Sequence, residues 1–374
     1  MTTDVETIVV GAGAIGLAVA DALAARGKRV LILEQHMRTG SETTARNSEV
    51  IHAGLYYRPG TLKARTCLAG KSLLYHFAAA NGVPVNRCGK LIVATSRHEL
   101  AKLEHIAADA AACGVEDLVM LSVAGVRAIE PNVTCAAGLL SPSTGVIDSR
   151  AFILALEGHI QAAGGELVLG ACVVGLQRLP SGYGVTVAER AGSQSTIYSR
   201  NLVIAAGLHS SSVAALLFAD PASPYRPPAT RFAKGHYFAI SGKVPFRRLI
   251  YPLPADGGLG MHLTLDTAGA ARLGPDVTYV DRISYDFEDG DGTRRERFIT
   301  EAARWWPDVI AAALEPDTTG IRPKLSGPGE PAADFAIHDE GVHGMAGLVA
   351  LYGIESPGLT ASLAIAQRVA VLLD

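Results

Sequence analysis

The sequence predicts an α/β protein of two domains, and three observations support this expectation. The chain has 374 residues, about twice the length of an ordinary domain, and 49% of them are hydrophobic, which is enough for sizeable cores. Its first 34 residues predict strand, helix, strand, which at this length is a parallel βαβ unit. Further along, helical segments and short segments of β character both occur.

The N-terminal half contains the longer helical patterns. The βαβ unit has its strands at 6–10 and 29–34 and its helix at 14–26. Further helices are expected at 61–82, 98–114 and 148–165, and each ends at glycine, a usual helix stop. We therefore expect Gly82 to terminate the first of these helices.

The C-terminal half is richer in short strands. Four are expected between 166 and 207, and the last runs into a glycine turn at Gly207. The Pro-rich stretch 220–230 predicts a linker, and residues 231–290 predict mostly short strands. A helix is expected at roughly 293–314, interrupted at Pro307. The tail combines a strand, a Gly/Pro turn and a long apolar helix.

Composition argues against several classes of protein. The formal net charge of −3 argues against a nucleic-acid binder that works through a large basic surface. We expect no transmembrane segment, because no run of about eighteen apolar residues occurs, and no secretory signal. The five cysteines are scattered without a CxxC, which indicates reduced thiols in a cytoplasmic protein and no metal site.

The first turn carries the pattern G-x-G-x-x-G in Gly11, Gly13 and Gly16. The three glycines allow, in order, a tight turn, close approach of the backbone to a pyrophosphate, and packing of the helix on the strand. Glu34 closes the second strand, where a carboxylate can accept a hydrogen bond from a ribose hydroxyl. The pattern predicts a Rossmann-type dinucleotide site that would hold NAD or FAD. A tight turn without a ligand is the alternative.

Two further stretches resemble a known family. The segment "NSEVIHAGLYYRPGTLKARTC" (47–67) follows the second strand, and "YGIESPGLTASLAIA" (352–366) leads into the last helix. With these segments the chain resembles the D-amino-acid oxidase superfamily of FAD enzymes, and most closely the L-2-hydroxyglutarate dehydrogenase/oxidase family. "YPLPADGGLGMHLTLD", "ARLGPD" and "GIRPKL" are similar to that family too. The resemblance covers the whole length and is sharpest at 8–71 and 318–366.

The resemblance implies a discontinuous architecture. A Rossmann-type FAD-binding domain would comprise 1–85, 145–220 and 320–374. A mixed β-sheet substrate domain with helices would comprise 86–144 and 221–319. We expect FAD to be bound without a covalent link, because no cysteine lies next to the expected flavin site.

The resemblance also implies the cofactor contacts. The polar loop after the second strand would pass the pyrophosphate and the flavin ring, since hydroxyls and arginine suit phosphate oxygens; a polar surface loop is the alternative. The turn at 353–360 would aim N–H groups of the last helix at the flavin, where an ordinary helix start is the alternative. The expected cofactor residues are Gly11, Gly13, Ala14, Ile15, Gly16, Glu34, Gln35, Thr43, Thr44, Arg46, Asn47, Ser48, Val173, Ala206, Gly207, Gly353, Ile354, Ser356, Pro357, Gly358, Leu359 and Thr360.

His52 is the expected catalytic base or substrate-orienting residue, because the resemblance implies a position close to the flavin. Packing against the flavin and a covalent link to it are the alternatives. Tyr56 and Tyr57 would face the substrate or fill the domain boundary. A carboxylate substrate needs cations, and Lys324 is expected near the reacting centre. The other expected substrate contacts are Arg231, Lys234, His262 and Arg322, with Lys63 as a further cation.

The implied function is FAD-dependent oxidation of a 2-hydroxy acid, L-2-hydroxyglutarate above all, to the 2-oxo acid by hydride transfer to flavin N5. An amine or amino-acid oxidase similar to glycine or sarcosine oxidase is the first alternative. A flavoprotein subunit or binding protein that oxidises no substrate of its own is the second. Oxygen, a quinone or a carrier flavoprotein would accept the electrons. The expected location is cytoplasmic, with peripheral attachment to a membrane as the alternative.

Overall fold

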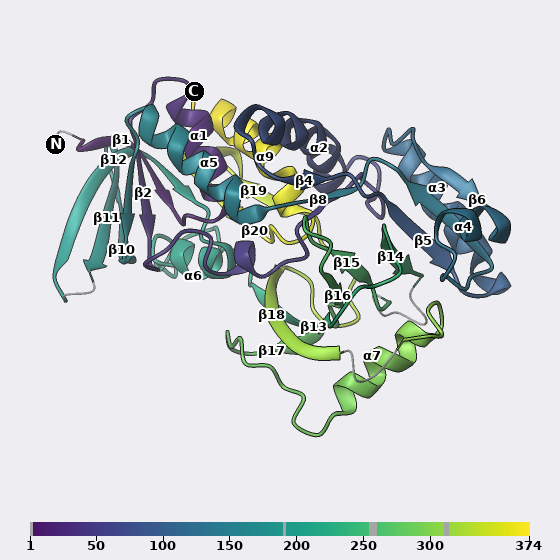
Figure 1. The fold of residues 1–374 in the computed structure, drawn as a ribbon. Helices are drawn as coiled ribbons and strands as arrows, with labels where there is room; N and C mark the ends of the chain where they lie inside the picture. The colour runs from purple at the N-terminus through teal and green to yellow at the C-terminus, as the bar shows by residue number, and fades with distance from the viewer. Residues whose placement is uncertain (1–2, 190–191, 254–259, 310–313) are drawn as a thin grey trace. The chain divides into compact units, whose positions relative to one another are not determined.

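The computed structural model describes residues 3–189, 192–253, 260–309 and 314–374, and the chain divides into two compact units (Figure 1). Unit 1 comprises residues 1–45, 149–232 and 322–374. Unit 2 comprises residues 46–148 and 233–321. Each unit is therefore assembled from segments that lie far apart in the sequence.

Unit 1 is built on an eight-stranded sheet with a parallel centre. Its strands are β1 (Val5–Val10), β2 (Val30–Glu34), β9 (Glu166–Leu169), β10 (Ala171–Leu179), β11 (Gly182–Glu189), β12 (Gln194–Ile204), β19 (Ala336–His338) and β20 (Leu348–Tyr352). The parallel strands lie in the order β9, β2, β1, β12, β20. β10, β11 and β12 form an antiparallel meander, and β19 pairs antiparallel with β20.

Helices cover both faces of this sheet. They are α1 (Ala14–Ala24), α5 (Ser149–Ala162), α6 (Ser210–Ala215), α8 (Glu340–His343) and α9 (Gly358–Leu372), with short 3-10 turns η1 (Thr43–Ala45) and η3 (Gly207–His209). α1 packs against α5 and α9, and α6 contacts β12 and β20 (Figure 1). Along β1, Ile8 and Val10 share a core with Ala214 and Phe218, whereas Val9 faces Gly16 of α1. A strand buried on both faces explains the unbroken apolar run in the sequence.

Unit 2 contains a nine-stranded mixed sheet. In sheet order its strands are β17 (Thr278–Val280), β13 (Arg231–Ile240), β16 (Ala271–Leu273), β15 (Leu263–Leu265), β14 (Leu249–Pro252), β5 (Lys90–Ala94), β7 (Ala137–Ser141) and β6 (Val119–Leu121), with β18 (Leu314–Lys324) beside β13. β5 runs parallel to β14 and antiparallel to β7. A separate antiparallel sheet holds β3 (Val50–Ile51), β8 (Gly145–Ile147) and β4 (Val85–Asn86).

The helices of unit 2 are α2 (Leu62–Asn81), α3 (Leu100–Ala112), α4 (Val123–Ile129) and α7 (Thr293–Ala303), with the 3-10 turn η2 (Arg97–Glu99). The Thr61 hydroxyl caps α2 by accepting from the Ala64 N–H, and Gly82 ends the helix at φ 64°. A left-handed residue of this kind closes a helix at little cost only when it is glycine. The predicted stop at Gly82 is therefore confirmed.

Several boundaries differ from the expectation. Residues 145–148 and 320–321, expected in the FAD-binding domain, group with unit 2, and residues 221–232, expected in the substrate domain, group with unit 1. Residues 46–85, expected in the FAD-binding domain, group with unit 2, because β3 and β4 pair with β8 there. The expected helix at 293–314 is wrong in its second half: α7 ends at Ala303, and Leu314 already begins β18. Pro307 disfavours helical backbone in the residue before it, and Trp305 and Trp306 turn into the core instead. Residues 310–313 lie outside the described part of the chain.

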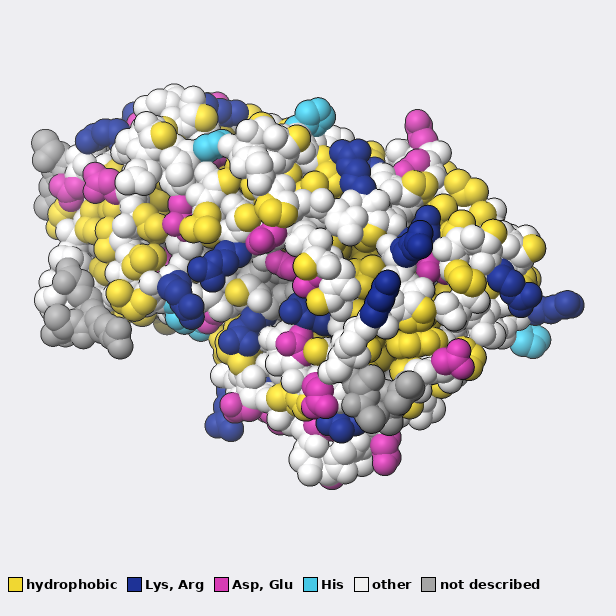
Figure 2. Space-filling model, in the orientation of Figure 1, with side chains coloured by type: hydrophobic (Ala, Val, Ile, Leu, Met, Phe, Trp, Pro, Cys, Tyr) yellow, Lys and Arg dark blue, Asp and Glu magenta, His cyan; other side chains and the backbone are white. Residues whose placement is uncertain are grey.

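Among the described residues, no helix is both long enough and apolar enough to cross a bilayer. On the face drawn in Figure 2, lysine and arginine side chains lie among aspartate and glutamate side chains, in keeping with the small net charge. The mixture of signs on this face gives no support to a nucleic-acid-binding surface.

Candidate functional site

The glycine turn of unit 1 lies where parallel strands end together. Gly11 follows β1, Gly207 follows β12 and Gly353 follows β20. These three strands run in one direction, so their carboxyl ends meet at one edge of the sheet. In open α/β sheets this edge is where ligands bind.

The first turn is closed by contacts that only glycine permits. Gly11 has φ 102°, and a Cβ there would lie 2.6 Å from the Ala205 carbonyl oxygen. A Cβ on Gly16 would overlap the carbonyl oxygen of Gly11. The Thr44 hydroxyl accepts from the Ala14 N–H at 3.0 Å and so ties the loop after β2 to the start of α1. The helix start, with its partial positive charge, is thereby presented to the loop.

Glu34 is held by the main chain at the end of β2. Its Oε2 accepts from the Ala12 N–H at 2.8 Å, and its Oε1 accepts from the His36 N–H at 2.9 Å. The side chain is 8% exposed. Each carboxylate oxygen keeps a second lone pair, so the fixed carboxylate can still accept from a ribose hydroxyl.

A pocket joins these features within unit 1. Its lining includes residues of the glycine turn, the end of β2, the loop after it, β10 and the end of β12: Val10, Gly11, Gly13, Leu33, Glu34, Gln35, His36, Gly40, Ser41, Glu42, Thr43, Thr44, Ala171, Cys172, Val173, Ala205, Ala206, Gly207, His209 and Val213. Nine of the expected cofactor residues lie in this one lining, from Gly11 to Gly207. The glycine turn, the start of α1 and the buried carboxylate of Glu34 together fit the adenosine and phosphate part of FAD.

Glu42 forms part of the rim of this pocket together with two histidines. Its Oε1 lies 3.2 Å from His36 Nε2 and 3.4 Å from His209 Nε2. The hydrogen bond to Glu42 raises the pKa of His209 above its ordinary value. Sequence reasoning missed both histidines, because the contact joins residues 36 and 209 only in the fold.

The turn at the start of α9 is closed by a short main-chain contact. Gly353 has φ 66°, and the Glu355 N–H donates to its carbonyl oxygen at 2.8 Å. Pro357 precedes the helix, and Gly358 is its first residue. Lys324 Nζ lies 3.0 Å from Glu355 Oε1, and both side chains are mostly buried. Lys324 therefore already has an acidic partner, and this pair ties the turn to β18.

Arg46, Asn47 and Ser48 belong to unit 2, where each has a protein partner. The Arg46 guanidinium lies 4.0 Å from the Tyr285 ring centre and donates to the Thr319 carbonyl oxygen. The Asn47 side chain accepts from the Glu49 N–H, and the Ser48 hydroxyl lies 2.9 Å from the Tyr237 hydroxyl. These contacts order the segment that leads to His52.

His52 follows β3 and is half-buried. Burial lowers its pKa well below the ordinary value, and the positive charges of Lys90 and His262 lower it further. His262 stacks on Tyr251 with ring centres 3.7 Å apart. The imidazole of His52 is thus uncharged at neutral pH, the form that accepts a proton.

The sequence did not point to two buried residues near His52 and His262. Lys90 and Tyr251 are buried on neighbouring strands, with Lys90 Nζ 4.7 Å from the Tyr251 ring centre. The only signal in the sequence was a lysine at the head of the apolar run "KLIVA". Of the two tyrosines near His52, Tyr57 is half-buried and Tyr56 is 46% exposed.

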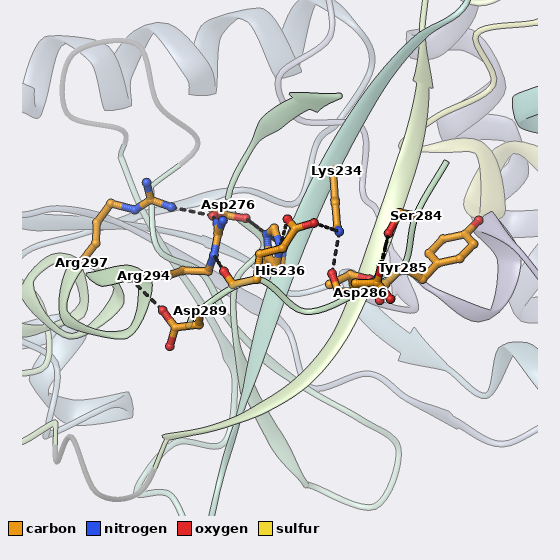
Figure 3. Close-up of polar contacts among 11 residues, drawn as sticks. Lys234, His236, Asp276, Ser284, Tyr285, Asp286, Asp289, Arg294 and Arg297 are labelled. Atoms are coloured by element: carbon orange, nitrogen blue, oxygen red, sulfur yellow. Dashed lines mark hydrogen bonds and ion pairs between the residues drawn. The ribbon is translucent and has the colours of Figure 1, made fainter. Parts of the chain in front are cut away.

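Lys234 lies in a network of charged side chains (Figure 3). Its ammonium group is buried and donates to Glu288 Oε1 at 3.0 Å and to the Asp286 carbonyl oxygen at 2.5 Å. Asp276, in the same network, accepts from His236 and pairs with Arg294 and Arg297 (Figure 3). The partners of Lys234 favour a structural role over the expected contact with substrate.

The remaining expected cations lie on different elements of the fold. Arg231 is exposed at the start of β13, and Arg322 is half-buried on β18. Lys63 is buried on α2. No group of three or more histidine, cysteine, aspartate or glutamate side chains suited to a metal ion occurs within the described ranges.

Comparison with known protein families identifies the family to which the chain belongs. The profile of the FAD dependent oxidoreductase family, DAO, matches residues 6–372. The L-2-hydroxyglutarate dehydrogenase of Arabidopsis thaliana, a mitochondrial protein by name, is 38% identical over 98% of this chain and 83% of its own length. The protein of the same name from Escherichia coli K12 is 33% identical over 73% of this chain and 64% of its own length.

Solved structures share the fold over the entire chain. The L-α-glycerophosphate oxidase of Mycoplasma pneumoniae, solved with FAD bound, superposes with a TM-score of 0.86 at 25% identity and covers 100% of this chain and 95% of that one. Glycine oxidase from Geobacillus kaustophilus superposes with a TM-score of 0.79 at 20% identity, with coverage of 100% and 95%.

Proposed function

The chain belongs to the FAD dependent oxidoreductase family, and from this premise we propose that it oxidises L-2-hydroxyglutarate to 2-oxoglutarate. The observation that supports this substrate is the match of almost the entire chain to the L-2-hydroxyglutarate dehydrogenase of Arabidopsis. An uncharged, half-buried histidine beside a buried lysine fits the chemistry, because the substrate is an alcohol that carries two carboxylates.

In this reaction the substrate loses a hydride from its α-carbon and a proton from its hydroxyl group. FAD, when bound, supplies the acceptor for the hydride. We assign the proton to one ring nitrogen of His52, which its lowered pKa keeps free to accept it at neutral pH. The Lys90 charge raises the cost of a second positive charge, so the protonated imidazole readily gives its proton up again to solvent.

The cofactor residues of this proposal are those of the unit 1 pocket and the turn at the start of α9. Glu34 would hold the ribose, and the glycine turn with Thr44 would hold the pyrophosphate. The start of α9 would place its positive end near the flavin and stabilise negative charge there. Of the expected cations, Lys324 and Lys234 are paired with glutamates.

We also propose that FAD is bound without a covalent link. Acid precipitation of the purified protein should release the yellow colour into the supernatant. Colour retained in the pellet would show a covalent link and would make His52 the first residue to examine. The proposed cytoplasmic location is tested by cell fractionation, since the Arabidopsis relative is mitochondrial by name.

The substrate proposal is tested by anaerobic addition of candidate substrates to the yellow holoenzyme. L-2-hydroxyglutarate should bleach the flavin absorbance, and glycine and sarcosine should not. Bleaching by an amine substrate but not by the hydroxy acid would instead establish an amine oxidase. A protein that binds FAD but is bleached by none of them would refute the proposed substrate.

A further inference from the structure

Lys90 is a charged residue in an unusual position. It opens β5 and is 0% exposed. Within the described residues its Nζ has no hydrogen-bond partner and no ion pair with an acidic side chain. An ammonium group has three donors to satisfy, and a buried one without a counterion is costly. The cost of this uncompensated charge would fall if an anion came close to it.

Within the described ranges, the groups around Lys90 do not neutralise its charge. The ring of Tyr251 on β14 lies 4.7 Å from Nζ, and the ring of Tyr56 lies 5.3 Å away. These ring faces attract a cation but carry no net charge. His52 and Cys67, the latter on α2, are further electrostatic neighbours. Burial raises the pKa of Cys67 to about 12, so its thiol is uncharged as well.

Side chains near Lys90 are partly exposed to solvent. Tyr56 is 46% exposed, and His52 and His262 are half-buried. Tyr56 also has φ 71°, a left-handed conformation that non-glycine residues adopt at a cost and that recurs at ligand sites. A small anion that rests on these side chains would lie within reach of the Lys90 charge, which the surrounding protein screens poorly.

We propose that Lys90 is a positioning residue that supplies the positive charge for a carboxylate-binding site at His52, His262 and Tyr56. The ligand class is a small carboxylate, and the inference rests on the proposed function in naming the substrate's own carboxylate as the occupant. Lys90 acts on the ligand through its charge from beneath the aromatic side chains, and His52 and His262 provide the surface that the ligand touches.

Calorimetric titration of the holoenzyme with glutarate tests this site. Glutarate has both carboxylates of the substrate but no hydroxyl group to oxidise. Lys90→Met keeps the length of the side chain and removes the charge, and it should weaken glutarate binding about 10- to 100-fold. Lys102→Met, on the exposed side of α3, is the matched control and should bind as the unaltered protein does.

A measurement on the unaltered protein avoids any question of folding. Burial lowers the pKa of Lys90 to about 8, so its positive charge is present below that pH and is lost as the pH rises through it. Glutarate affinity should therefore fall between about pH 7 and pH 9. Tyr56, Cys67 and Tyr251, whose pKa values burial raises, do not change charge in this window, and His52 changes charge at lower pH.

Two results would overturn the Lys90 proposal: equal glutarate affinity in Lys90→Met, or no glutarate binding by the unaltered holoenzyme at pH 7. The proposed function is judged separately by flavin bleaching. Bleaching by L-2-hydroxyglutarate together with unchanged glutarate binding in Lys90→Met removes the role of Lys90 and leaves the function standing. Glutarate binding that depends on Lys90, without bleaching by L-2-hydroxyglutarate, removes the proposed function and leaves the role of Lys90 standing.

Discussion

Replacement of Glu34 by glutamine changes the hydrogen bonds and the charge of its side chain in the pocket of unit 1. The two carboxylate oxygens accept from the N–H groups of Ala12 and His36 at 2.8 and 2.9 Å. Glutamine has one acceptor oxygen, so it satisfies one of these donors and turns its own NH2 group toward the other. It also removes the negative charge that would hold the ribose.

Each hydrogen bond to a charged group contributes about 1.5–3 kcal/mol. Loss of the ribose bond should therefore raise the Kd for FAD about 10- to 100-fold. Loss of one main-chain bond should lower the free energy of unfolding of the apoprotein by a similar 1.5–3 kcal/mol. Quenching of FAD fluorescence measures the first quantity, and urea denaturation measures the second.

Glu166→Gln is the matched control, because Glu166 is exposed and lies opposite Leu31 of β2 on the neighbouring strand. Both quantities should stay unchanged in this variant. If Glu34→Gln binds FAD with the affinity of the unaltered protein, the ribose is held elsewhere and the assignment of the pocket is refuted.

Four further predictions follow from the geometry. His52→Ala should keep its FAD and reduce it about 100-fold more slowly or worse in stopped-flow mixing with L-2-hydroxyglutarate, and an unchanged rate would show that His52 only packs. The value of kcat/KM should fall on the acid side only below about pH 6.5, the ordinary pKa of histidine, because the base form of His52 is required and burial lowers its pKa. A fall that begins above that pH would contradict the assignment. Cys172, exposed in the pocket lining, should react with a thiol reagent in the apoprotein and be protected by FAD, whereas buried Cys67 should stay unreactive in both forms; equal labelling of Cys172 with and without FAD would place the cofactor elsewhere. Gly11→Ala should lower the free energy of unfolding by at least about 1–3 kcal/mol, since the residue has φ 102° and its Cβ would meet Ala205, and a stability equal to that of the unaltered protein would contradict this.

Local patterns made the βαβ unit predictable. The apolar run of β1, the three glycines and Glu34 lie within about thirty residues of one another, so the turn, the helix start and the acidic strand end could be placed from the sequence. The start of α9 was placed in the same way by the Gly/Pro turn that runs from Gly353 to Pro357 and Gly358. These features depend on neighbours in sequence, which a single chain displays directly.

Features that depend on distant residues were not predictable in this way. Lys90 meets Tyr251 because β5 runs parallel to β14, a pairing across about 160 residues. The partner of Lys234 on the segment before α7 was equally hidden, so its pairing with Glu288 could not be predicted. The grouping of segment 46–85 with unit 2 was not predicted, because its short strands give little signal until β8 pairs with them.

The most direct test of the proposed oxidation of L-2-hydroxyglutarate is a single anaerobic turnover with measurement of the product. One equivalent of L-2-hydroxyglutarate per bound FAD should bleach the flavin fully and yield one equivalent of 2-oxoglutarate, and the D-enantiomer should yield none. Full FAD occupancy with no 2-oxoglutarate from the L-enantiomer, or equal yields from both enantiomers, would contradict the proposed function.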